Sequence, residues 1–153
     1  MGNTSEVPKL LSAELVEFLQ GPQLVLVTTL DSETGGPTNN LITWVVAVDS
    51  GRLRLAADAR GRVMANIRAD GRVLLTVMAH GACHSIEGTA RIIADEVKDV
   101  NLKLGIAEVQ VQAVRNITFW GGQITANPQY DVTYDKALKA KLDTGVFHAM
   151  RSL

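Results

Sequence analysis

Short apolar segments separated by turn residues limit this chain to a mainly β fold. Most of them are six to eight residues long, which is typical of strands and short for buried helices. Residues 107–114 alternate between apolar Val or Ala and polar Glu or Gln, the period of a strand with one buried face. The expected strands are residues 24–30, 41–48, 52–57, 72–79, 83–94 and 107–114.

The connections between these segments favour an antiparallel sheet that closes into a barrel. The turn signal "DSG" at 49–51 predicts a hairpin between the second and third strands. Closure removes the exposed edges that long apolar strands would otherwise present. Apolar residues at helical spacing predict short helices at 12–20, 60–69 and 135–150, the last with Leu138, Leu142 and Val146 on one face. With 153 residues and no linker, the chain is expected to form one domain over residues 1–153.

Composition argues against several classes of partner. The formal net charge is -1 and no basic run occurs, so we expect no nucleic-acid binding. No apolar run reaches eighteen residues and the start "MGNTSEVPKLL" lacks the regions of a signal peptide, so we expect no membrane association. The single cysteine, Cys83, fits a reducing cytoplasm. His80, His84 and His148 lack metal-ligand spacing, so no metal site is expected.

The segment "DARGRVMANI" at 58–67 carries the clearest chemical signal. Arg60 and Arg62 flank Gly61 where the third strand gives way to a helix. Guanidinium groups match phosphate oxygens, a helix start adds free N–H groups, and a glycine lets a ligand approach the main chain. Asn66 follows one turn after Arg62 and would orient it or reach the ligand. The alternative is a pair of solvated arginines at a flexible turn, paired with Asp58 or Asp70.

Residues 22–94 resemble the pyridoxamine 5'-phosphate oxidase-like family, the FMN-binding split barrels. The resemblance rests on "NNLITWVVAV", "DARGRVMANI", "RADGRVLLTV" and "SIEGTARI", which follow the family's order and spacing. It implies a six-stranded antiparallel split β-barrel with FMN as cofactor. In the family an Arg at the strand–helix junction, often followed by Lys, binds the FMN phosphate. Arg62 matches that Arg, whereas Val63 stands in the Lys position and leaves Arg60 to supply the second charge.

The resemblance also implies other contacts to the cofactor. The second strand would lie along the isoalloxazine ring, residues 56–58, which end in Asp58, would flank the ribityl chain, and Ser85 would reach the cofactor, often from the partner subunit. The family usually forms homodimers with FMN at the subunit interface. The ring neighbours would be Asn40, Leu41, Ile42 and Thr43.

The two tryptophans admit two interpretations each. Trp120, which precedes two glycines at a strand end, would cover a flavin face across a dimer interface, or would pack in that interface without a cofactor. Trp44 lies in an apolar strand, which favours a place in the core over a place in the site.

No pair of acidic and basic side chains suited to general acid–base catalysis stands out, which agrees with chemistry carried by a cofactor. We therefore expect an FMN-dependent oxidoreductase acting on a small molecule. The alternatives are a non-catalytic flavin- or nucleotide-binding module (a sensor, carrier or reservoir), a barrel that binds F420 or haem in the same cleft, and an assembly protein without cofactor. The vitamin B6 oxidase itself is not expected, because the segment "AKLDTGVFHAMRSL" has neither the Trp nor the Arg-x-His motif of that enzyme.

Overall fold

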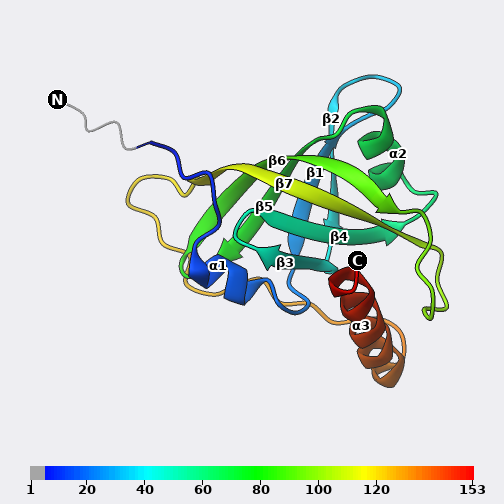
Figure 1. Cartoon of the computed structure of the whole chain (residues 1–153). Helices are drawn as coiled ribbons and strands as arrows, with labels where there is room; N and C mark the ends of the chain where they lie inside the picture. The colour runs from blue at the N-terminus through cyan, green and yellow to red at the C-terminus, as the bar shows by residue number, and fades with distance from the viewer. Residues whose placement is uncertain (1–5) are drawn as a thin grey trace.

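A computed structural model describes residues 6–153, so the first five residues of the expected domain lie outside the described part. The described elements alternate strands with short helices and end on the longest helix (Figure 1). In chain order they are α1 (Ala13–Phe18), β1 (Val25–Leu30), β2 (Pro37–Ile42), β3 (Val45–Asp49), β4 (Arg52–Asp58), α2 (Arg62–Ala69), β5 (Arg72–Ala79), β6 (Ala82–Ala94), β7 (Leu104–Asn116) and α3 (Lys136–Arg151).

The strands form one antiparallel sheet of seven strands in the order β2-β1-β5-β6-β7-β4-β3. The sheet curls around its own core, with α2 at one end and α1 on the opposite side (Figure 1). β2 and β3 are its two edges although they are consecutive in the chain. The mainly β, antiparallel split-barrel prediction is confirmed, with seven strands in place of six.

The extra strand arises because the predicted strand 41–48 is two strands. β2 ends at Ile42, β3 begins at Val45, and the two residues between them carry the chain from one sheet edge to the other. β2 also begins earlier than expected, at Pro37, before the start of the predicted strand 41–48. Pro37 has no N–H to donate to the ladder. An edge strand tolerates this because one of its sides has no partner strand.

The barrel interior is filled by buried apolar side chains from β1, β3–β7, α1 and α2, and Ile42 of β2 packs against them. The alternation predicted for 107–114 is confirmed, since Val109, Val111 and Ala113 are buried. β6 contains a bulge between Glu87 and Gly88. A Cβ atom on Gly88 would lie 2.5 Å from Val109 Cγ1, so the close approach of β6 and β7 at the bulge requires glycine.

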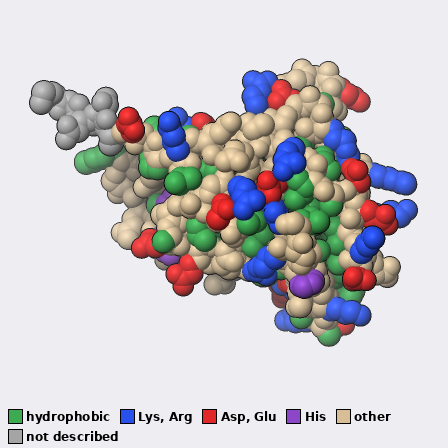
Figure 2. All heavy atoms as spheres, viewed as in Figure 1, with side chains coloured by type: hydrophobic (Ala, Val, Ile, Leu, Met, Phe, Trp, Pro, Cys, Tyr) green, Lys and Arg blue, Asp and Glu red, His purple; other side chains and the backbone are tan. Residues whose placement is uncertain are grey.

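A second, smaller core lies between the sheet and α3. It contains Val46, Ala56, Val97, Leu104, Ile106, Val146, Phe147 and Met150. Apolar side chains of this region reach the surface between the right-hand end of the sheet and α3, where lysines and arginines surround them (Figure 2).

Only the C-terminal half of α3 packs against this core, and its N-terminal half projects beyond the sheet (Figure 1). The buried residues of α3 are Val146, Phe147 and Met150, whereas Leu138 is 45% exposed. The helix over 135–150 is confirmed, but the predicted Leu138–Leu142–Val146 face is wrong at its start. Helical periodicity identifies an apolar stripe and does not show how far the sheet extends beneath it.

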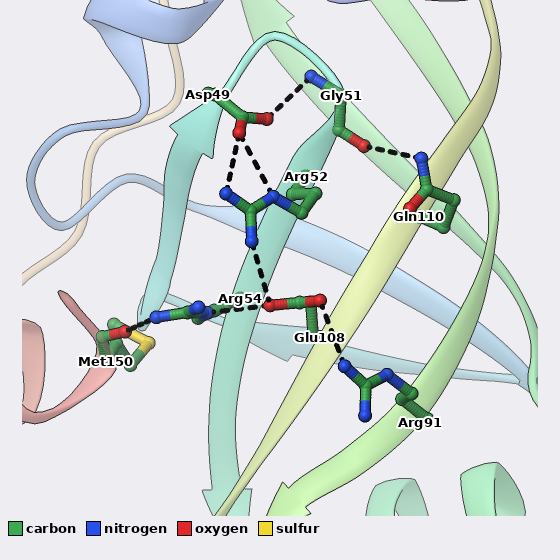
Figure 3. A network of polar contacts seen from close by, with 8 residues as sticks. All are labelled: Asp49, Gly51, Arg52, Arg54, Arg91, Glu108, Gln110 and Met150. Atoms are coloured by element: carbon green, nitrogen blue, oxygen red, sulfur yellow. Dashed lines mark hydrogen bonds and ion pairs between the residues drawn. The ribbon is translucent and has the colours of Figure 1, made fainter. Parts of the chain in front are cut away.

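A polar network joins the end of α3 to the sheet (Figure 3). Arg54 on β4 is 5% exposed; its Nε donates to Glu108 Oε2 at 3.0 Å and its Nη1 donates to the carbonyl oxygen of Met150 at 2.7 Å. Arg52 and Arg91 approach the same Glu108 carboxylate from more exposed positions, at 3.8 and 3.5 Å. Arg54 is therefore a buried cation that an acidic partner and a helix C-terminus stabilise together.

Across residues 6–153, no helix has the length and apolar character needed to cross a bilayer.

Candidate functional site

A cavity of about 490 Å³ lies where the end of β2, the end of β4 and the start of α2 meet. It thus brings together three of the segments that the sequence singled out, and a fourth segment from just before α3. Its lining residues are Asn40, Ile42, Thr43, Trp44, Ala56, Ala57, Asp58, Gly61, Arg62, Val63 and Tyr134.

The N-terminus of α2 opens into this cavity. Gly61 is the N-cap and has no side chain to accept from the first N–H groups of the helix. The preceding turn is held by Asp58, whose Oδ1 accepts from the Arg60 N–H at 3.0 Å and whose carbonyl oxygen accepts from the Gly61 N–H at 2.9 Å. A Cβ atom on Gly61 would lie 3.1 Å from Asp58 Cβ, so glycine fits this turn best. The arrangement presents free N–H groups and the positive end of the helix dipole to the cavity.

The two arginines of "DARGRVMANI" lie in different places. Arg62 lines the cavity, and its Nη1 donates to Thr38 Oγ1 on β2 at 3.3 Å, so its side chain reaches from α2 toward the neighbouring strand. The Arg60 side chain is exposed and lies outside the lining. Of the predicted pair, the structure therefore brings one guanidinium to the cavity.

Asn66 is 1% exposed and its amide group is used within the protein. Its Nδ2 donates to Thr29 Oγ1 and its Oδ1 accepts from the Ser32 N–H, both at 2.9 Å. The side chain thus fixes the loop after β1 onto α2 and lies outside the cavity lining.

The same loop after β1 begins with Asp31. Its carboxylate accepts hydrogen bonds from the N–H groups of Thr34 and Glu33, and these bonds lower the pKa of the carboxyl.

The other wall of the cavity is formed by residues of β2 and β4. Asn40 and Ile42 point into it from β2, while Leu41, between them, points to the other face and is exposed. Ala56 and Ala57 on β4 add small side chains that leave room for a ligand. Within residues 6–153, Asn40 Oδ1 is the buried side-chain polar atom that lacks a hydrogen-bond partner. An unpaired buried acceptor in a cavity wall is a position that a ligand or an ordered water would satisfy.

Ser85 and Trp120 lie away from this cavity. Ser85 is buried on β6, paired with Thr76 of β5 and Arg115 of β7. Trp120 is 97% exposed in the loop that follows β7, which lies at the left in Figure 1, while α2 lies at the right. Within one chain, the structure does not bring these two residues to the other predicted site residues.

Trp44 and Tyr134 are lining residues that the sequence did not identify as part of the site. Trp44 packs partly against the second core and partly lines the cavity, so both interpretations of this residue hold. Tyr134 immediately precedes Asp135, the N-cap of α3, and sits far along the chain from the other lining residues. The only feature of the sequence that could have identified Tyr134 is its position just before a helix start, in a stretch without strand or helix periodicity.

The cavity has two chemically different ends. Arg62, which reaches Thr38 near the start of β2, and the open helix N-terminus provide positive charge at one end, and the wall around Ile42 and Trp44, at the other end of β2, is largely apolar. This distribution suits a molecule that carries an anionic group, such as a phosphate, on a flat ring system. Among the described residues, no three His, Cys, Asp or Glu side chains form a group that could hold a metal ion.

Comparison with solved structures finds the same fold at low sequence identity. A candidate pyridoxamine 5'-phosphate oxidase from Lactobacillus delbrueckii is 17% identical, with a TM-score of 0.60 over 71% of this chain and 95% of that one. A protein named F420 reductase is 19% identical, with a TM-score of 0.54 over 65% and 94%. HutZ, described as the haem storage protein of Vibrio cholerae, is 11% identical, with a TM-score of 0.52 over 69% and 94%.

Sequence comparison identifies the family. A search of curated proteins found no match. The family model described as pyridoxamine 5'-phosphate oxidase matches residues 11–132, which include every lining residue of the cavity except Tyr134. The chain therefore belongs to the pyridoxamine 5'-phosphate oxidase family.

Proposed function

We propose that this protein binds FMN in the cavity at the start of α2 and acts as an FMN-dependent oxidoreductase on a small molecule in the cytoplasm. The observation that carries the proposal is the uncapped N-terminus of α2, with Arg62 beside it, at one end of a cavity of about 490 Å³. The helix N–H groups and Arg62 would bind the phosphate. The family assignment supports a flavin.

The remaining lining residues would hold the ribityl chain and the ring. Asp58 and the two alanines before it lie next to the phosphate end, and Ile42, Thr43 and Trp44 form the wall beyond them. FMN, when bound, supplies hydride transfer at its ring. The chain's own residues bind it, orient it and cover it from water.

Thermal unfolding in the presence of FMN tests this function. At a hundredfold excess over Kd, binding to the native state adds about 2.7 kcal/mol of stability, or about 5–10 °C in Tm for a chain of this size. A hydrogen-bonded charge contributes about 1.5–3 kcal/mol, so Arg62→Ala should raise Kd by about ten- to a hundredfold. At the same FMN concentration this leaves about 0.4–1.4 kcal/mol of stabilisation.

Arg60→Ala is the matched control, because it removes the same charge two residues away from a side chain outside the cavity lining. It should keep most of the shift. Equal losses in both variants would point to general electrostatic attraction, and an intact shift in Arg62→Ala would refute the phosphate assignment. Riboflavin, which lacks the phosphate, should bind the wild-type protein at least as weakly as FMN binds Arg62→Ala, because it also loses the contacts to the helix N–H groups. F420 and haem, tested in parallel, decide between FMN and the ligands that the structural neighbours' names suggest.

We further propose that the protein is a homodimer with the cofactor at the subunit interface. Trp120 and Phe119 expose 97% and 78% of their surface next to each other, which is unusual for large apolar side chains on a free surface. A second copy would cover them and would bring Trp120 and Ser85 toward the partner's cavity. Sedimentation equilibrium should give twice the monomer mass, and Trp120→Ser with Phe119→Ser should shift it toward the monomer. A monomeric wild-type protein would refute this assembly.

A non-catalytic flavin-binding module is the second candidate function. The observation that favours it is the cavity lining itself: of the described residues that line the cavity, Asp58 alone carries a carboxylate, and that carboxylate is engaged in the turn before α2. Anaerobic mixing of the FMN-loaded protein with NADH or NADPH separates the two functions. Bleaching of the flavin followed by reoxidation with an acceptor indicates an oxidoreductase, whereas bound FMN that is never reduced indicates a carrier or sensor.

A further inference from the structure

An ion pair on α3 lies directly behind the cavity wall. Lys139 Nζ lies 2.5 Å from Asp143 Oδ2, and both side chains are largely covered, at 25% and 14% exposure. The other carboxylate oxygen, Asp143 Oδ1, accepts a hydrogen bond from the indole Nε1–H of Trp44 at 2.8 Å. Asp143 thus joins α3 to a residue that lines the cavity.

The cluster extends back to the segment before α3. Lys139 Nζ lies 5.3 Å from the centre of the Tyr130 ring, within the range of a cation–π contact. The hydrogen bond to Asp143 is the main reason that the pKa of Lys139 is raised, so the lysine stays charged and paired at neutral pH. Lys139 is therefore bound within the cluster and is not a free cation.

These polar contacts matter because the N-terminal half of α3 has little apolar anchorage. Leu138 is 45% exposed, and the first buried residue of the helix is Val146. The hydrogen bond from Trp44 to Asp143 is therefore a main contact between this half and the body of the protein. Tyr134, one residue before the α3 N-cap, lines the cavity, so its place depends on where this half of the helix lies.

We propose that Asp143 is a positioning residue that fixes an aromatic wall, Trp44 and Tyr134, against the ring of the bound cofactor. The carboxylate acts through the Trp44 indole and through α3, and does not itself line the cavity. Trp44 follows the end of β2, whereas Arg62 reaches Thr38 near the start of that strand, so the wall selects for the ring and Arg62 selects for the phosphate. This inference rests on the proposed function, because the ring it assigns is that of FMN.

Ligands with and without a ring distinguish binding of the ring by the aromatic wall from binding of the phosphate by Arg62. Asp143→Leu replaces the acceptor by an apolar side chain with the same branching, and should weaken FMN binding about five- to tenfold, the loss expected when aromatic contacts with a ring are no longer held in place. It should leave the Kd of ribitol 5-phosphate, which has the phosphate and no ring, within twofold. Asp143→Asn keeps an oxygen for the Trp44 N–H, and Lys139→Met keeps Asp143, so both should bind FMN within twofold of wild type. Isothermal titration calorimetry measures both ligands.

Fluorescence of the ligand-free protein gives a second readout. In a Trp120→Phe background Trp44 is the sole tryptophan. Asp143→Leu should then shift its emission to longer wavelength and lower its anisotropy, and Asp143→Asn should change neither. Trp44→Phe, which removes the donor of the same bond and leaves a smaller aromatic ring in the wall, should reproduce the selective loss of FMN and serves if Asp143→Leu fails to fold.

An unchanged Trp44 emission in Asp143→Leu, or equal losses for FMN and ribitol 5-phosphate in both Asp143→Leu and Trp44→Phe, would overturn the proposal. If FMN binds to none of the proteins, including wild type, the proposed function fails. The fluorescence comparison still decides in that case whether Asp143 holds the indole.

Discussion

Substitution of Arg54 by methionine tests the polar network between the sheet and α3 (Figure 3). Arg54→Met keeps the length of the stem, removes the donor to the Met150 carbonyl and leaves Glu108 without its most buried partner. Removing one partner of a buried ion pair costs about 3–5 kcal/mol. Glu108 retains Arg52 at 3.8 Å and Arg91 at 3.5 Å, so the loss should fall at the lower end of that range, about 3 kcal/mol.

Urea unfolding followed by circular dichroism gives the free energies. A loss of about 3 kcal/mol is a large part of the 5–15 kcal/mol typical of a domain, so the midpoint should move visibly at an unchanged m-value. Amide hydrogen exchange should show faster exchange in the last turns of α3, because Arg54 stabilises the C-terminal end of that helix through the Met150 carbonyl.

Two further variants test whether burial of the Arg54–Glu108 pair causes the loss of stability. Arg91→Met removes an exposed partner of the same carboxylate and should cost less than about 1 kcal/mol. The double variant Arg54→Met with Glu108→Leu removes the buried acid together with its base, and should lie within about 1 kcal/mol of wild type, because apolar pairs often replace buried ion pairs without loss. If Arg54→Met costs less than about 1 kcal/mol, or if the double variant is less stable than the single one, the buried pair does not have the assigned role.

Three other outcomes follow from the structure. Gly88→Ala should cost about 1–3 kcal/mol in urea unfolding because the added Cβ meets the neighbouring strand at the bulge, whereas Gly21→Ala, with open space around it, should be nearly neutral. Asn66→Ala should cost about 2 kcal/mol through its two buried hydrogen bonds and leave the Kd for FMN within twofold; a tenfold loss would contradict its structural role. The hydrogen bond from Arg72 lowers the pKa of Asp70 to about 2, so the stabilisation from this pair is complete above pH 3.8 and is lost as the pH falls toward 2. NMR titration should find that pKa raised toward 3.8 in Arg72→Gln, and an unchanged pKa would contradict the assignment.

Local patterns predicted the parts of the fold that depend on local physics. The alternation in 107–114 identified β7 because each polar residue there faces solvent or the edge of the core. The helix predicted over 12–20 begins at Ser12, whose side chain caps α1 by accepting from the Leu15 N–H. The break between β2 and β3 left no such pattern, because Thr43 and Trp44 continue an unbroken apolar run and only the closure of the sheet separates the strands.

The part of the site that neighbouring residues build was predictable, and the part that tertiary packing builds was not. Gly61 and Arg62 could be identified because a phosphate site at a helix start is built from neighbouring residues. Tyr134 could not, because it meets the cavity through the packing of α3, about seventy residues after Arg62. Asn66 lies one helical turn after Arg62, the spacing expected of a second ligand contact. Its buried amide instead forms hydrogen bonds with Thr29 and Ser32, which the sequence pattern does not show to be near α2.

The short link between the two outer strands has a mechanical consequence. β2 and β3 stand at opposite margins of the sheet, and only Thr43 and Trp44 join them. Any widening or narrowing of the gap between these margins must be absorbed by rotations at the same two residues that line the ligand cavity. A substitution there would change the fit to a bound molecule and the aperture of the barrel together, so ligand choice and barrel opening cannot be adjusted independently at this point of the chain.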